Sequence, residues 1–130
     1  MQVKITPSPL AGTVQLPPSK SFAIRALICS ALAGGGSVAP LGTSADIAAT
    51  VQALADLDAG RDEIFCNESG SLVRFLIPVA AALGKSVTFT GAGRLHRRPL
   101  DAFATLLPQH GVQVQTDGGL PFSITGKLRP

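Results

Sequence analysis

The chain has 130 residues, which is enough for one compact domain, and its 45% hydrophobic and 15% charged residues are typical of a globular protein. Its formal net charge is +3, and it contains six phenylalanines but no tryptophan or tyrosine. The mild basic excess is compatible with a small anionic ligand. Since the aromatic platforms that stack on bases are scarce, we expect no nucleic-acid partner.

Cysteine spacing and the hydropathy pattern disfavour a metal-binding, a secreted or a membrane protein. Cys29 and Cys66 form no Cys-x-x-Cys motif and have no histidine at metal-ligand spacing, so we expect reduced thiols and no metal or other cofactor. The first residues lack the apolar core of a signal peptide, and the longest uncharged run, residues 26–45, is broken by glycines and a proline. The sequence therefore predicts a cytoplasmic protein that does not bind a membrane.

The first part of the chain predicts a strand, a helix and a second strand. Residues 1–19 are expected to form an opening strand segment. Ser19 suits the N-cap of a helix from about Lys20 to Ala33, which Gly34 would end. A short strand is expected over Ser37 to Leu41.

The central part predicts a helix, a strand and another helix. Apolar residues at helical spacing indicate an amphipathic helix from about Ser44 to Leu57, with Asp46 in its first turn, where the helix dipole favours a carboxylate. A strand is expected over Glu63 to Cys66. The serine-rich turn after it leads into an apolar helix that runs to Leu83 and ends at Gly84.

The last part predicts a strand, a helix and a hairpin. Ser86 to Thr90 alternates in polarity as a strand does, and a helix is expected from Pro99, at its first position, to about His110. The runs Val112 to Thr116 and Phe122 to Thr125 flank Asp117-Gly118-Gly119, a composition typical of a hairpin turn.

The order of helix, strand, helix and strand occurs twice. Arg25 and Arg74 occupy corresponding places about 50 positions apart. We therefore expect a first repeat unit over residues 20–66 and a second over residues 67–130. Alternating helices and strands with short connections predict an α/β (α+β) protein in which helices pack on a sheet of mixed strands.

Two arginines are unusual because each lies early in an apolar helix. A cation near a helix N-terminus opposes the macrodipole, and a guanidinium among apolar side chains needs a partner. One interpretation is an ion pair within the fold, with Asp46 or Glu68, or a side chain that extends to water. Because Arg25 and Arg74 recur at corresponding places, each beyond a serine-containing turn, we favour a site for a phosphate or carboxylate.

Neighbouring residues fit the same site. Ser21 shares a helix face with Arg25. Lys20, at the first helical position, would add a positive charge at the same end of the helix. Gly70 suits a close approach of the backbone to a ligand, although an ordinary turn glycine is an equal alternative.

A third basic element lies in the loop between a predicted strand and the helix after it. Its sequence is Arg94-Leu95-His96-Arg97-Arg98-Pro99. Loops of this kind often carry function, and a solvated run of charge is the alternative. More than half of the 11 lysines and arginines lie in these three segments, so the basic excess is concentrated at the predicted site.

The three motifs resemble those of the EPSP synthase (3-phosphoshikimate 1-carboxyvinyltransferase) family. The N-terminal signature of the family resembles Pro18-Ser19-Lys20-Ser21-x-x-x-Arg25-Ala26-Leu27. The helix start Gly-(Thr/Ser)-x-x-Arg is similar to Glu68-Ser69-Gly70-Ser71-x-x-Arg74-Phe75, and the Arg-x-x-x-Arg-Pro segment to Gly93-Arg94-Leu95-x-x-Arg98-Pro99-Leu100. Order and spacing match over nearly the whole chain, which we identify as an N-terminal portion of such an enzyme.

The resemblance implies a fold and a reaction. The fold is built from repeated βαβαββ units in an enolpyruvyl-transferase domain, an inside-out α/β barrel. The reaction transfers the enolpyruvyl group of phosphoenolpyruvate to the 5-hydroxyl of shikimate 3-phosphate, in the shikimate pathway of aromatic amino acid biosynthesis, and needs no metal.

The resemblance also assigns roles to individual residues. Lys20, Gly70 and Arg94 would contact phosphoenolpyruvate, at the glyphosate site of the family, with Lys20 and Arg94 as the catalytic residues. Ser21 and Arg25 would hold shikimate 3-phosphate. Arg74 would act in support or on the phosphoenolpyruvate side, and supporting charge would come from Arg97 and Arg98.

The chain departs from the family pattern. The third unit, with its Ser-Ser-Gln motif, and the second domain, with its acidic and lysine residues, are absent, and the segment between Leu57 and Glu68 is shorter than in typical relatives. We therefore expect the chain alone to be inactive. A complementary C-terminal chain, or self-association through an exposed apolar face, would be its partner.

Two other interpretations stay open. One is a stand-alone anion-binding module without catalysis. The other is a sister family of the same fold, the UDP-N-acetylglucosamine enolpyruvyl transferases or the RNA 3′-phosphate cyclases. Lys20-Ser21 in place of Lys-Asn, and the missing loop cysteine near Arg94, argue against the sister transferase, and the cyclases lack these motifs.

Overall fold

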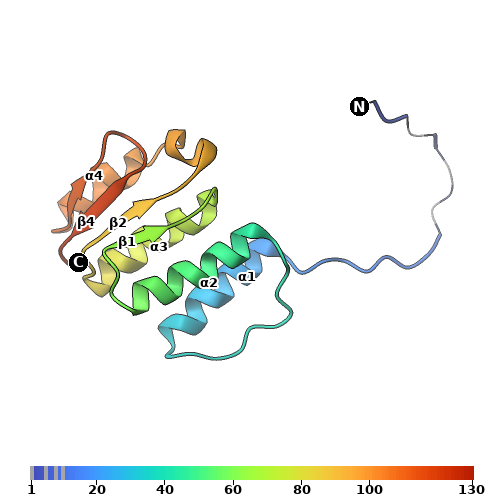
Figure 1. Cartoon of the computed structure of the whole chain (residues 1–130), viewed down its shortest axis with the longest axis horizontal. Helices are drawn as coiled ribbons and strands as arrows, with labels where there is room; N and C mark the ends of the chain where they lie inside the picture. Colours follow the sequence, from blue (N-terminus) through green and yellow to red (C-terminus); the bar gives the residue numbers. More distant parts are fainter. Residues whose placement is uncertain (1, 5, 8, 10) are drawn as a thin grey trace.

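Helices and strands alternate along most of the chain. The computed structural model describes residues 2–4, 6–7, 9 and 11–130 (Figure 1). Its elements are α1 (Lys20–Leu32), α2 (Ala45–Asp58), β1 (Glu63–Phe65), α3 (Gly70–Leu83), β2 (Val87–Thr90), the 3-10 helix η1 (Gly93–Arg97), α4 (Asp101–Gln109), β3 (Gln113–Gln115) and β4 (Phe122–Thr125).

Serine side chains start the first three helices. The hydroxyl oxygens of Ser19, Ser44 and Ser69 each accept a hydrogen bond from the backbone N–H three residues further on, at 3.4, 3.3 and 3.4 Å. Each bond satisfies an N–H that has no partner within the helix. At the other end of α3, Gly84 has a φ of 72°, the left-handed conformation that commonly ends a helix. These caps confirm the predicted starts of the three helices and the predicted end of α3.

The strands form one mixed sheet in the order β1-β2-β4-β3. β1 and β2 are parallel, with α3 between them in the sequence, whereas β4 is antiparallel to both β2 and β3. Ile64, Phe89 and Phe122 lie next to one another across three strands, and each is 0% exposed. The predicted α/β class and the predicted hairpin are thus confirmed.

The first three helices share an orientation that matters for the site. α1 packs on α2, α2 packs on β1 and α3, and α3 packs on β2 and β4. Figure 1 shows the N-termini of α1, α2 and α3 at the same end of the molecule, the end towards which β1 and β2 point. Three positive helix ends and the carboxyl ends of two parallel strands therefore face one side.

Several details of the structure differ from the sequence prediction. Residues 37–41 form no strand; Pro40 cannot donate to a strand ladder, and positive φ angles at Gly34, Gly35 and Gly36 turn the chain before it. The loop after β2 contains η1, which was not predicted. α4 begins after Leu100 as its N-cap, so Pro99 precedes the helix.

The segment before α1 is extended. The described residues of 1–19, predicted as an opening strand, form no strand, and residues 1, 5, 8 and 10 lie outside the description. Val14 and Leu16 are 80% and 81% exposed. Within the part of the chain that the structure describes, no helix has the length and apolar character needed to cross a bilayer.

The two cysteines are free and lie in different environments. Cys29 is exposed on α1, whereas Cys66 is fully buried just after β1. Desolvation by burial raises the pKa of the Cys66 thiol to about 12. Cys66 therefore stays protonated at neutral pH and acts as a small apolar core residue.

Candidate functional site

The three motif segments meet around the start of α3. The guanidinium carbon of Arg25, in α1, lies 5.6 Å from the centre of the Phe75 ring in α3. From the same helix, Arg74 reaches the segment that follows η1, where its Nη2 donates to the carbonyl oxygen of Pro99 at 3.2 Å. These two contacts thus join residues from all three motifs at one place.

Arg74 connects two backbone segments. Besides the bond to Pro99, its Nη1 donates to the carbonyl oxygen of Gly70 at 3.1 Å, one turn back in α3. The side chain is half-buried, and its two acceptors are neutral carbonyl groups. The partner that a guanidinium needs is therefore supplied here by the backbone, and not by Glu68, which the sequence had offered as one alternative.

Gly70 lies under two guanidinium groups. It is buried, and a Cβ atom at this position would lie 2.5 Å from Nη1 of Arg98 and 2.9 Å from Nη1 of Arg74. A residue with a side chain would force both groups to move. The absence of a side chain at Gly70 thus allows two cationic groups to approach the N-terminus of α3 closely.

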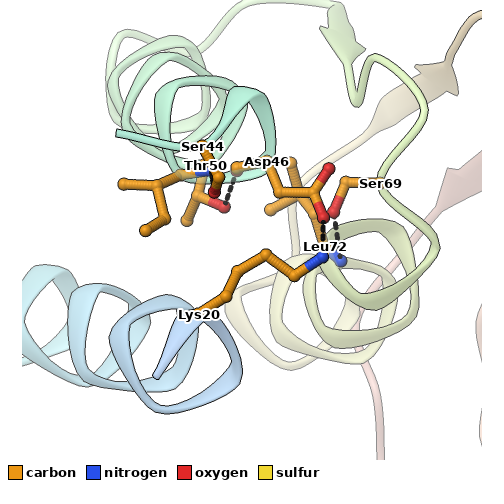
Figure 2. Close-up of polar contacts among 7 residues, drawn as sticks. Lys20, Ser44, Asp46, Thr50, Ser69 and Leu72 are labelled. Atoms are coloured by element: carbon orange, nitrogen blue, oxygen red, sulfur yellow. Dashed lines mark hydrogen bonds and ion pairs between the residues drawn. The ribbon is translucent and has the colours of Figure 1, made fainter. Parts of the chain in front are cut away.

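Lys20 is held by a carboxylate. Its Nζ lies 2.6 Å from Oδ2 of Asp46, in the first turn of α2 (Figure 2). The two side chains are 50% and 25% exposed. The sequence had offered Asp46 as an ion-pair partner for an arginine, but the structure gives this partner to Lys20. The ammonium consequently lies between the starts of α1 and α2.

The remaining predicted residues lie at the surface. Ser21, Arg94 and Arg97 are exposed, and so is Arg25, which stacks on Phe75 instead of being enclosed by apolar side chains as expected. Within residues 11–130, none of the motif arginines lies within 4.0 Å of a carboxylate oxygen. Their charges are therefore available to an anion.

The backbone of η1, which carries Arg94, is anchored at both sides. Leu95 is buried in the core, and Gly93 has a φ of 55° and lies against the carboxylate of Glu68. A Cβ at Gly93 would lie 2.5 Å from Oε1 of Glu68. Both contacts fix the place from which Arg94 extends. The sequence gave no signal for η1, because its short 3-10 turn depends on these contacts from other segments.

An apolar groove lies at the opposite ends of the same helices. Its volume is about 250 Å³, and it is lined by Ala31, Leu32, Leu54, Leu57, Asp58, Val79, Leu83 and Lys85. None of the motif residues lines it. The motif residues lie instead on an open surface, where cationic side chains and helix N-termini can attract a phosphate or a carboxylate.

The chain is similar to members of one known family. The model of the EPSP synthase (3-phosphoshikimate 1-carboxyvinyltransferase) family matches residues 5–64 and 56–129. A 3-phosphoshikimate 1-carboxyvinyltransferase of Clostridium kluyveri is 38% identical over 98% of this chain and 35% of its own length. One of Clostridioides difficile is 35% identical over 98% of this chain and 36% of its own length. The chain thus spans about a third of the length of these curated relatives.

A solved structure shares the fold. The EPSP synthase from Acinetobacter baumannii superposes with a TM-score of 0.72 at 23% identity, over 90% of this chain and 32% of that one. The alignment with the Clostridium kluyveri relative extends over 148 positions, more than the 130 residues of the chain, and the two family matches overlap at residues 56–64. The shorter segment expected between Leu57 and Glu68 stays a prediction.

Proposed function

Because the chain belongs to the EPSP synthase family, we propose that it forms the N-terminal part of a 3-phosphoshikimate 1-carboxyvinyltransferase. The proposed reaction transfers the enolpyruvyl group of phosphoenolpyruvate to shikimate 3-phosphate. Both substrates carry a phosphate and a carboxylate, and we propose that the reaction takes place in the cytoplasm. The observation that carries the proposal is the meeting of three basic motifs at the start of α3.

We assign the phosphoenolpyruvate side of the site to Lys20, Gly70 and Arg94. Lys20 and Arg94 supply cationic groups that would stabilise charge in the reaction, and Gly70 is the position expected to face glyphosate. The support for Lys20 is its place at the positive ends of α1 and α2, and the support for Arg94 is its exposure on an anchored turn.

We assign the shikimate 3-phosphate side to Ser21 and Arg25, which are both exposed on the first turns of α1. Arg74 has a supporting role, which agrees with its bonds to two carbonyl groups. Arg97 and Arg98 add positive charge nearby. Residues 20–66 and 67–130 are the two repeat units of the proposed domain.

Titration of shikimate 3-phosphate tests this assignment. Arg25→Ala is expected to weaken binding by about 1.5–3 kcal/mol, because a charge-assisted hydrogen bond to the phosphate is lost. Isothermal calorimetry measures the affinity, and Arg61→Ala is the control because it removes an equal charge outside the motifs. Equal affinities of Arg25→Ala and the unchanged protein would remove Arg25 from the site. If the unchanged protein binds neither substrate, the proposed function is wrong.

The first two helices expose apolar side chains. α1 is apolar on nearly all sides, yet Phe22 and Leu32 are 70% and 52% exposed, and Val51 of the adjacent α2 is 47% exposed. Helices that are apolar all round are normally buried. We propose that a complementary C-terminal chain covers this face, and that the isolated protein uses it to self-associate.

Sedimentation equilibrium tests the apolar face. The isolated protein is expected to form dimers or larger species at micromolar concentration, and Leu32→Glu is expected to shift it towards the monomer, because a carboxylate would be buried in the contact. Leu106→Glu is the matched control, since Leu106 is 53% exposed but lies on α4. A monomer at all concentrations, or equal effects of the two variants, would contradict self-association through α1.

A further inference from the structure

We propose that Asp46 is a positioning residue, which determines where the Lys20 ammonium lies at the anion site. The inference rests on the proposed function, because it concerns how one assigned residue is held. The observation is the ion pair between Nζ of Lys20 and Oδ2 of Asp46 at 2.6 Å, which joins the first residue of α1 to the first turn of α2. The two residues are 26 positions apart in the sequence.

Lys20 is poorly placed without such a partner. It occupies the first position of α1, where the positive end of the helix dipole repels an ammonium group. A lysine side chain has four rotatable carbon bonds, and this one is half exposed, so nothing else in the described contacts restricts it. Without a partner, the Lys20 ammonium group would extend into water, away from the helix N-termini where an anion would bind.

Asp46 presents its carboxylate from a rigid support. The N-terminus of α2 favours a negative charge, and Ser44 caps this helix by accepting from the N–H of Ile47 at 3.3 Å. The carbonyl oxygen of Asp46 accepts a hydrogen bond from the Thr50 hydroxyl at 2.7 Å, and Thr50 is 0% exposed. Figure 2 shows Lys20 extending from α1 towards this first turn of α2.

The ion pair leaves Lys20 able to bind a ligand. An ammonium group has three N–H donors, and Asp46 uses one of them, so two remain for the oxygens of a phosphate or carboxylate. The role of Asp46 is thus to hold Lys20 in place, without direct contact with the substrate.

This role and a simple charge effect predict opposite results. If Asp46 acted only as a negative charge near an anion site, its removal would strengthen anion binding. If it positions Lys20, its removal weakens binding. The sign of the change in affinity therefore separates the two interpretations.

The first experiment measures phosphoenolpyruvate and shikimate 3-phosphate affinity by calorimetry. Asp46→Asn is expected to weaken binding of at least one of them by about twofold to fivefold, as for loss of a partly exposed ion pair, and Asp46→Glu is expected to restore part of the loss. Asp58→Asn is the control, because it makes the same charge change at the other end of α2. In a Lys20→Ala background, Asp46→Asn is expected to cause no further loss of affinity, since the loss acts through Lys20.

The second experiment needs no ligand. Brief acetylation with acetic anhydride, quantified by mass spectrometry, is expected to modify Lys20 more slowly in the unchanged protein than in Asp46→Asn, with exposed Lys127 as the internal reference. Equal rates of Lys20 acetylation in the two proteins would overturn the proposal. Equal or tighter anion binding by Asp46→Asn would also overturn it. If the unchanged protein binds neither substrate, the proposed function fails, and the acetylation rates alone decide whether Asp46 holds Lys20.

Discussion

Phe89→Ala is expected to destabilise the fold by about 3–5 kcal/mol, the usual cost of removing a fully buried aromatic side chain. Phe89 lies in β2, an inner strand, and is paired with Ile64 on one side and Phe122 on the other. All three side chains are 0% exposed, so the cavity left by the substitution has no access to water. Since single domains are stable by only about 5–15 kcal/mol, this one change removes a large part of the total.

Urea unfolding followed by far-UV circular dichroism measures the loss for Phe89→Ala. Phe65→Ala is the matched control, because Phe65 lies in the neighbouring β1 strand but is 50% exposed. Its substitution is expected to cost much less. Similar losses for the two variants would mean that the row of Ile64, Phe89 and Phe122 is not the centre of the core.

Local signals explain what could be predicted of the fold. Ser19, Ser44 and Gly84 were identified as helix ends because a cap depends on residues within one turn of it. The mixed sheet followed from the order of elements. The strand expected over residues 37–41 failed because an apolar run becomes a strand only where a partner strand is available, and these residues pair with none.

The sequence predicts which residues make up the site, but not which of them contact one another. The clustering of lysines and arginines in three motifs is visible in the sequence, and the structure brings residues from all three together. Which group holds which side chain was not predictable. Asp46 pairs with Lys20 and not with an arginine, because the choice depends on how α1 packs against α2. Long-range packing of this kind has no signature in sequence spacing.

The arrangement also separates two kinds of cationic group. Arg25 and Arg94 are exposed and have no carboxylate within 4.0 Å among residues 11–130, so they can meet a ligand. Arg74 uses both terminal nitrogens on backbone carbonyl groups. The motif thus combines residues that face the surface with one that fixes the backbone around them. A supporting residue of this kind is expected to affect both stability and binding when it is removed.

Arg74→Leu is therefore expected to destabilise the fold by about 2–3 kcal/mol, because two charge-assisted hydrogen bonds are lost and the Gly70 carbonyl is left without this donor. It is also expected to weaken shikimate 3-phosphate or phosphoenolpyruvate binding, because the segment that ends at Pro99 is no longer tied to α3. Arg74→Lys keeps the charge but lacks the forked geometry that spans two acceptors, so it should recover little of either property.

Urea unfolding and calorimetric titration of the Arg74 variants measure the two effects, with Arg61→Leu as the control for loss of an exposed arginine. If charge alone mattered, Arg74→Lys would behave like the unchanged protein, and the connection between Gly70 and Pro99 would have no function. If stability fell while anion affinity stayed constant, Arg74 would support the fold but not the site. A parallel loss of both in Arg74→Leu and Arg74→Lys, with Arg61→Leu unaffected, is the result that the two carbonyl contacts require.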